Sequence, residues 1–204
     1  MSAMRFFAMT CAALPLSLIL FAPVFPAAAA DKDVIVEQPG ANLSPKQHVN
    51  QLFEQLKRER DPDKASGIAD EIRTEWNDSG SATVNLLMQW ADKAIQEKRT
   101  AAALDFLDQA IALKPDYAES WNRRATLNYA NDNYRKSMSD IERVLDIEPR
   151  HFGALSGMAA ILMETGNDAL ALKAWERFLA IYPANRSAQE QMNTLSEKLA
   201  GSRT

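Results

Sequence analysis

The chain contains few of the side chains that carry out catalysis or hold metal ions. Its only cysteine is Cys11, and its two histidines, His48 and His151, lie 103 positions apart. A thiolate nucleophile or a zinc site needs several such groups close together. Because His151 follows Pro149 and Arg150 in an expected turn, we interpret it as a solvated polar residue; a metal site with nearby carboxylates is the alternative.

The motifs of phosphate binding and hydrolysis are also missing from the sequence. It has no glycine-rich phosphate loop, no Gly-x-Ser-x-Gly elbow and no His-Glu-x-x-His motif. The stretch 153–157 (GALSG) has only the small residues expected where helices crowd together, and the pair Asp105 and Asp108 falls on an expected helix surface. We therefore expect no catalytic residue, no cofactor and no metal, and an independent hydrolase is the least favoured class.

The composition indicates a helical, globular protein that does not bind nucleic acid. The sequence is 47% hydrophobic and 25% charged, with only 7 glycines. It is rich in Ala, Leu, Glu, Lys and Gln, which favour helices. The formal net charge is −4, whereas a nucleic-acid-binding face needs an excess of Lys and Arg.

A repeat with a fixed period organises most of the chain. Pro115, Pro149 and Pro183 are spaced 34 residues apart, and each closes a similar apolar phrase. Proline lacks an amide hydrogen and disfavours helix at the preceding residue, so each marks the end of a second helix. The spacing predicts helix hairpins at 84–117, 118–151 and 152–185.

Large and small residues alternate at fixed places of these units, as two interlocking helices require. The fourth and twenty-fourth places hold Leu87, Trp121, Leu155, Leu107, Ile141 and Trp175. The eighth and twentieth places hold Ala91, Ala125, Ala159, Ala103, Ser137 and Ala171. Turns are expected at 98–100, 131–134 and 165–168. The four tryptophans fall at packing places, so we expect Trp76, Trp90, Trp121 and Trp175 in the core.

The residues Trp121, Ala125, Tyr134 and Pro149 match the pattern of the tetratricopeptide repeat family. This resemblance implies an all-α fold, an α-solenoid of helical hairpins, and a protein-binding scaffold without enzymatic activity. The leader, the acidic segment after it and the phrases 118–125 and 148–155 are also similar to a group of periplasmic repeat proteins of α-proteobacteria. That narrower similarity implies a role in cell-envelope maintenance.

The two ends of the array differ from its middle. Residues 46–83 carry apolar stripes with Phe53, Leu56, Ala69 and Trp76 at repeat places, but lack the closing proline. We interpret them as a divergent hairpin that caps the array; a separate hairpin packed on 84–117 is the alternative. Residues 186–200 are expected to form a capping helix with one apolar face, consisting of Ala188, Met192, Leu195 and Leu199.

The first 30 residues have the layout of a secretory signal peptide. Arg5 precedes an uncharged apolar stretch, and small residues up to Ala30 precede Asp31. Cleavage after Ala30 would leave a periplasmic chain without a stable membrane anchor; an uncleaved anchor is the alternative. Residues 31–45 lack a sustained period and are expected to form a flexible tether.

The resemblance implies that the first helix of each unit lines a groove for a protein or peptide partner. The family's basic clamp for a terminal carboxylate is absent, because its places hold residues such as Met88 and Asp92. The expected partner-binding residues are Asn85, Met88, Asp92, Ile95, Glu119, Asn122, Arg123, Thr126, Tyr129, Ser156 and Met163. Gly153 and Ala160 occupy further inward places.

Two adjacent arginines leave two interpretations open. Arg123 and Arg124 could bind a carboxylate or phosphate of a ligand. We favour a structural role, in which Arg124 pairs with Asp140 or Glu142 and Arg123 covers a neighbouring repeat. The predicted function is a periplasmic adaptor that holds another envelope protein; an accessory subunit of an envelope or cell-wall modifying enzyme is the alternative.

Overall fold

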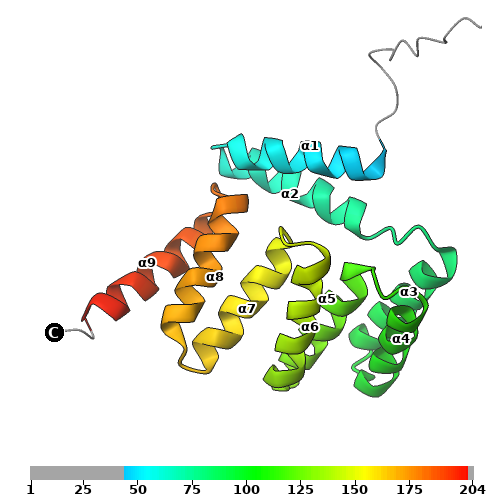
Figure 1. The fold of residues 1–204 in the computed structure, drawn as a ribbon. Helices are drawn as coiled ribbons and strands as arrows, with labels where there is room; N and C mark the ends of the chain where they lie inside the picture. The colour runs from blue at the N-terminus through cyan, green and yellow to red at the C-terminus, as the bar shows by residue number, and fades with distance from the viewer. Residues whose placement is uncertain (1–43, 202–204) are drawn as a thin grey trace, which may run out of the picture. The chain divides into compact units, whose positions relative to one another are not determined.

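A computed structural model describes residues 44–201, and the expected signal peptide and the tether up to residue 43 lie outside this range. Every regular element among the described residues is a helix (Figure 1), which confirms the all-α prediction. The helices are α1 Pro45–Arg58, α2 Pro62–Trp76, α3 Ala82–Gln96, α4 Thr100–Leu113, α5 Ala118–Ala130, α6 Tyr134–Ile147, α7 Phe152–Glu164, α8 Asp168–Ile181 and α9 Arg186–Gly201. Pro45, assigned to the tether from sequence, is the first residue of α1.

Helices α3 to α8 form three hairpins that stack through α4 on α5 and α6 on α7. The 34-residue period governs the backbone itself, because Lys98, Asp132 and Gly166 all adopt positive φ at the same place of their turns. The amide of the following residue then donates to a carbonyl in the last turn of the first helix, for example Arg99 N to Ala94 O at 2.8 Å. This left-handed cap ends each first helix and turns the chain into the second.

The interlocking predicted from sequence is present in the three hairpins. The small residues at the eighth and twentieth places are all nearly inaccessible. The polar one among them, Ser137, donates its hydroxyl to the Ala125 carbonyl at 2.8 Å, so it is buried without an unpaired group. Trp121 is only half-buried, and its indole N–H donates to the Pro115 carbonyl.

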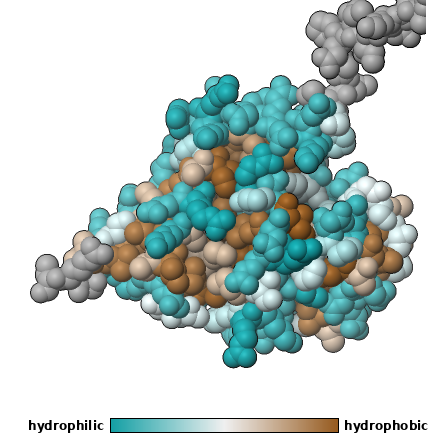
Figure 2. Space-filling view, viewed as in Figure 1, coloured by the Kyte–Doolittle hydropathy of each residue, from teal (hydrophilic) through white to brown (hydrophobic). Residues whose placement is uncertain are grey.

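The first hairpin, α3–α4, keeps one apolar side exposed. Trp90 is 45% exposed, so the prediction that it lies in the core is wrong. Apolar surface is visible over this end of the molecule, on the right in Figure 2. Among the described helices α3 packs chiefly against α4, whose Phe106 lies beside the Trp90 ring.

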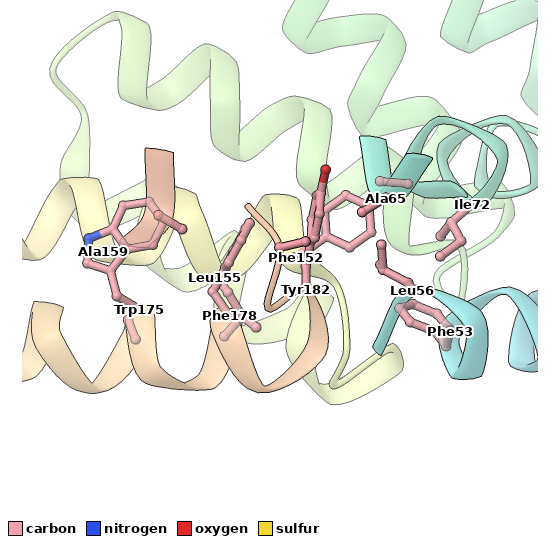
Figure 3. Packing of buried hydrophobic residues seen from close by; sticks show 14 of the residues in the cluster. Phe53, Leu56, Ala65, Ile72, Phe152, Leu155, Ala159, Trp175, Phe178 and Tyr182 are labelled. Atoms are coloured by element: carbon pink, nitrogen blue, oxygen red, sulfur yellow. The ribbon is translucent and has the colours of Figure 1, made fainter. Parts of the chain in front are cut away.

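The N-terminal hairpin, α1–α2, packs on the third repeat. Leu52, Phe53, Leu56 and Ile72 share one buried cluster with residues of α7 and α8, including Phe152 (Figure 3). The buried cluster of the first repeat contains no residue of α1 or α2. We expected the hairpin to cap the array or to pack on 84–117, and this prediction is wrong.

Aromatic side chains of the third repeat explain why the α1–α2 hairpin packs there. Phe152 lies within 6.1 Å of Tyr182 and 5.0 Å of Trp76, measured between ring centroids, and the Arg73 guanidinium lies over its ring. The Arg150 guanidinium covers Phe53 at 4.1 Å. The hairpin thus buries its apolar stripes on the most aromatic part of the array.

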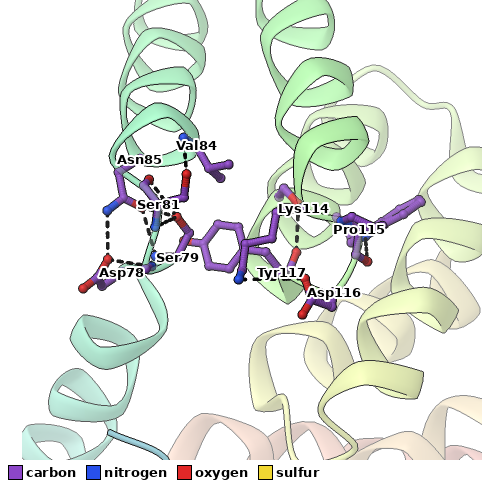
Figure 4. Close-up of polar contacts among 12 residues, drawn as sticks. Asp78, Ser79, Ser81, Val84, Asn85, Lys114, Pro115, Asp116 and Tyr117 are labelled. Carbon is purple, nitrogen blue, oxygen red and sulfur yellow. Dashed lines mark hydrogen bonds and ion pairs between the residues drawn. The ribbon is translucent and has the colours of Figure 1, made fainter.

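A five-residue link at 77–81 joins α2 to α3 without continuing the repeat. It lets the α1–α2 hairpin fold back onto the third repeat. Asn85 holds the link by accepting from the Ser79 amide at 2.9 Å and donating to Asp78 at 2.8 Å (Figure 4). The Tyr117 ring, from the turn that follows α4, points towards the same link. Burial raises the pKa of the Tyr117 phenol above its ordinary value.

The C-terminal helix α9 covers α8, as predicted. Its Ala188 and Leu195 are buried against the third repeat. Lys198 Nζ lies 2.6 Å from Asp168 at the start of α8. The third repeat is therefore covered on two sides, by α9 and by the α1–α2 hairpin.

Candidate functional site

Three connected hollows run along the first helices of the repeats, and together we call them the groove. The first hollow, of about 400 Å³, lies between α3, α5 and the 77–81 link. The second, of about 230 Å³, lies between α2, α5 and the start of α7, and the third, of about 180 Å³, between α5, α6 and α7. Arg123 borders the first two hollows, and Asn122 borders the last two, so neighbouring hollows share a lining residue.

Most of the residues expected at the partner surface line this groove. The first hollow is bordered by Asn85, Met88, Asp92 and Arg123, the second by Glu119, Asn122 and Arg123, and the third by Asn122, Thr126, Tyr129 and Ser156. Ile95 and Met163 instead pack against the buried clusters of the first and third repeats. Several of the lining residues already have partners within the chain, which limits what they can offer a ligand.

The second hollow is built around a buried polar pair, His151 and Glu119. His151 is 1% exposed, so its interpretation as a solvated turn residue is wrong. Its Nδ1 accepts from the Ala154 amide at 3.0 Å and caps α7. Because Nδ1 is an acceptor there, Nε2 carries the proton and donates to Glu119 Oε1 at 2.9 Å. Trp76 stacks on the imidazole at 4.3 Å.

The Glu119 carboxylate is stabilised in its charged form despite burial. Burial alone would raise its pKa, but hydrogen bonds from His151 and Asn122 and the charge of Arg123 outweigh burial and hold the pKa below its ordinary value. Asn122 Nδ2 donates to Glu119 Oε2 at 3.1 Å. Asn122 itself lines both the second and the third hollow.

Both arginines of the central repeat have structural partners. Arg124 holds Asp140 with two hydrogen bonds, of 3.0 and 2.6 Å, and reaches Asp108 of the preceding repeat at 2.6 Å. Arg123 pairs with Asp92 of the first repeat and donates to Asn77 at 2.9 Å. This pairing agrees with the structural interpretation of Arg124 and places Arg123 between the first two repeats.

Sequence reasoning missed the contribution of the N-terminal hairpin to this site. Arg73, Trp76 and Asn77 line the second hollow together with Phe152. They lie outside the three clear repeats, and their place in the register gave no signal that α2 returns to the start of α7. The groove therefore has a wall that the array of repeats does not supply.

The described residues hold no group of three or more His, Cys, Asp or Glu side chains placed to bind a metal ion. Between residues 44 and 201 there is also no helix long and apolar enough to cross a membrane. The polar side chains of the groove are amides, hydroxyls and paired ions. Such groups hydrogen-bond a polypeptide backbone and recognise its side chains.

A curated relative decides the family. A tetratricopeptide repeat-containing protein of Rhizobium etli is 77% identical to this chain over 204 residues, which is the full length of both. The chain belongs to the tetratricopeptide repeat (TPR) family. Anaphase-promoting complex subunit 3 of Schizosaccharomyces pombe is 25% identical over 89 residues, 44% of this chain and 13% of that protein. No family model matches the chain.

Solved TPR structures share the fold. The first TPR domain of Spaghetti (RPAP3), bound to an HSP90 peptide, superposes with a TM-score of 0.55 at 20% identity, over 59% of this chain and 95% of that one. The MamA protein gives a TM-score of 0.52 at 15% identity, over 75% of this chain and 81% of its own. A complex of the yeast Sti1 TPR2B domain with pHsp70 gives 0.53 at 14% identity, over 58% and 99%.

The TPR fold is a scaffold for protein–protein interactions, and its members are generally non-enzymatic. Helices of successive repeats present a groove built from several units, so that one partner segment touches them all. In this TPR chain the groove is formed by α3, α5 and α7, with α2 as an added wall.

Proposed function

We propose that the chain is a periplasmic adaptor that holds an extended segment of a cell-envelope protein in the groove. The observation that carries this proposal is the third hollow, whose lining residues are all uncharged and mostly small. Gly153, Gly157 and Ala125 line it together with Asn122 and Ser156. The small residues admit a partner backbone, and Asn122 and Ser156 can accept its amide hydrogens.

The arrangement of the hollows favours a segment over a small molecule. The groove divides its space into three neighbouring hollows of about 180 to 400 Å³, each of them bordered by α5. An extended peptide runs its backbone over the third hollow and places side chains in the larger first and second hollows. The peptide complexes of the RPAP3 and Sti1 domains support the same kind of partner.

The location in the envelope rests on the first 30 residues. Their signal-peptide layout supports export, and the similarity to periplasmic repeat proteins supports an envelope role. Purification from the source bacterium tests this directly, because an exported chain starts at Asp31 and is found in the periplasmic fraction. A cytoplasmic chain with Met1 retained contradicts the proposal.

Site-specific photocrosslinking in cells tests the groove. We expect a photoreactive residue at Tyr129, on the third hollow, to capture an envelope protein that mass spectrometry identifies. The matched control is the same residue at Leu170, which is 50% exposed on α8 outside the groove. Capture of the same proteins from both positions, or of none from Tyr129, contradicts the proposed groove.

A further inference from the structure

The first hollow of the groove carries two carboxylates whose charge the chain offsets only in part. Asp78 of the 77–81 link and Asp92 of α3 border it, and among the described residues Arg123 is the one cation that borders it as well. Arg123 pairs with Asp92, whereas no described Lys, Arg or His forms an ion pair with Asp78. The lining of the first hollow is therefore negative.

Each of the two carboxylates keeps one oxygen without a hydrogen bond. Asp78 Oδ1 accepts from Asn85 Nδ2 at 2.8 Å and from the Gly80 amide at 2.9 Å. Asp92 Oδ1 accepts from Arg123. No residue of the described chain donates to Oδ2 of either carboxylate. The bonds from Asn85 and Gly80 hold the pKa of Asp78 below its ordinary value, so this carboxylate is charged at neutral pH.

Tyr117 adds a third acceptor to the same hollow. It is 7% exposed and lines the hollow, and its ring points towards the 77–81 link (Figure 4). Its hydroxyl has no hydrogen-bond partner among the described residues. The only fully enclosed polar atom without a partner in this part of the chain is Trp175 Nε1. The Tyr117 hydroxyl is therefore open to a ligand in the hollow.

We propose that the first hollow binds a basic side chain of the partner segment, a lysine or an arginine, and this inference rests on the proposed function. Such a cation donates hydrogen bonds to the free oxygens of Asp78 and Asp92 and to the Tyr117 hydroxyl. Met88, which is 5% exposed, and the Tyr117 ring offer apolar surface to its aliphatic stem.

The second hollow has the opposite charge and does not suit the same side chain. Arg73 and Arg123 border it, and Glu119 is the only carboxylate among its lining residues. Both oxygens of Glu119 already accept hydrogen bonds, Oε1 from His151 and Oε2 from Asn122. A basic side chain is repelled there, so the charges of the two hollows fix which part of the segment enters the first.

Affinity selection from peptide pools tests this inference on the protein that starts at Asp31. The pools contain short capped peptides of random uncharged residues, with a central residue fixed as lysine, arginine, norleucine or glutamate. Norleucine keeps an aliphatic stem without the charge. We expect the lysine or the arginine pool to be retained at least about tenfold better than the norleucine pool, and the glutamate pool to be retained least.

Two variants locate the basic residue in the first hollow. Asp78→Asn removes a charge but keeps an acceptor oxygen for the link, and Tyr117→Phe removes only the unpartnered hydroxyl. We expect each to reduce the preference for the basic pool at least about threefold, with unchanged helicity by circular dichroism. The matched control is Asp105→Asn, an exposed carboxylate on α4 outside the groove, which keeps the preference.

The outcomes separate this inference from the proposed function. Peptides that are retained with no preference for a basic residue overturn the inference and leave the groove as a peptide site. A preference that both Asp78→Asn and Tyr117→Phe keep in full also overturns it. Retention of no pool at all overturns the inference and the proposed function together.

Discussion

The first and third repeats have the same design but different surroundings. The first repeat buries Leu87, Ala91, Ala103 and Leu107 in a cluster that it shares with Leu127 of α5, and it leaves Trp90 exposed. The third repeat shares its cluster with α1, α2 and α9. A repeat cannot bury both its sides alone, so its stability depends on what lies beside it. The contrast indicates that the array is held most firmly at its C-terminal end.

The largest expected effect is at Phe152, which joins the hairpin to the third repeat and is 2% exposed. Phe152→Ala leaves a cavity among aromatic rings, and we expect it to lower the free energy of unfolding by about 3–5 kcal/mol. The matched variant in the first repeat is Phe106→Ala, where the ring is only partly buried, and we expect about 1–2 kcal/mol. Chemical denaturation measures both, and equal losses would remove the contrast between the repeats.

His151 comes next, because it caps α7 and pairs with a buried carboxylate. His151→Ala leaves Glu119 without its main donor in a buried site, so we expect a loss of about 2–3 kcal/mol in the free energy of unfolding. The control is His48→Ala on α1, whose imidazole is half-exposed and 3.7 Å from Glu75, and which we expect to change stability by less than about 0.5 kcal/mol. A similar loss in both variants argues against the buried pair.

Acid should weaken the same pair. The folded pKa of Glu119 lies below its unfolded value, so its contribution is complete above about pH 4.3 and is lost as pH falls through the folded pKa. We expect Glu119→Gln to reduce the difference in unfolding free energy between pH 7 and pH 3. Glu142→Gln, on the exposed side of α6, serves as the control. An unchanged difference in the Glu119 variant contradicts this assignment.

The smallest expected effect on folding is at Trp90. Because its ring is half in solvent, Trp90→Ala should lower the unfolding free energy by less than about 1 kcal/mol. Chemical denaturation measures the loss. A loss as large as that of Phe152→Ala would show that the first repeat depends on this ring for its own core.

Periodicity predicted what is local and repeated. The spacing of Pro115, Pro149 and Pro183 located the ends of the second helices, and the structure ends α4, α6 and α8 two residues before each proline. It also placed most of the groove residues, because inward places follow from the register alone. The same period places a turn at 98–100, where Lys98 has a positive φ as Asp132 and Gly166 do in the other two turns.

Periodicity did not predict contacts between distant parts of the chain. The stripe of Leu52, Leu56 and Ile72 shows that α1 and α2 bury a face, but not which repeat receives it. That choice depends on aromatic surface that exists only once α7 and α8 are folded together. The burial of His151 depends on the same event, since Trp76 covers its ring.

Because the α1–α2 hairpin packs on α7 and α8, it can fold into place only after these later helices have been synthesised. The hairpin leaves the ribosome, or an export channel, before the residues on which it packs, about a hundred positions later in the chain. Until α8 emerges, the apolar sides of α1 and α2 have nowhere to dock, and contacts over such sequence distances form slowly. A chain that is truncated before α8 therefore exposes the apolar surface of α1 and α2. Chaperones or proteases can recognise such a chain as incompletely folded.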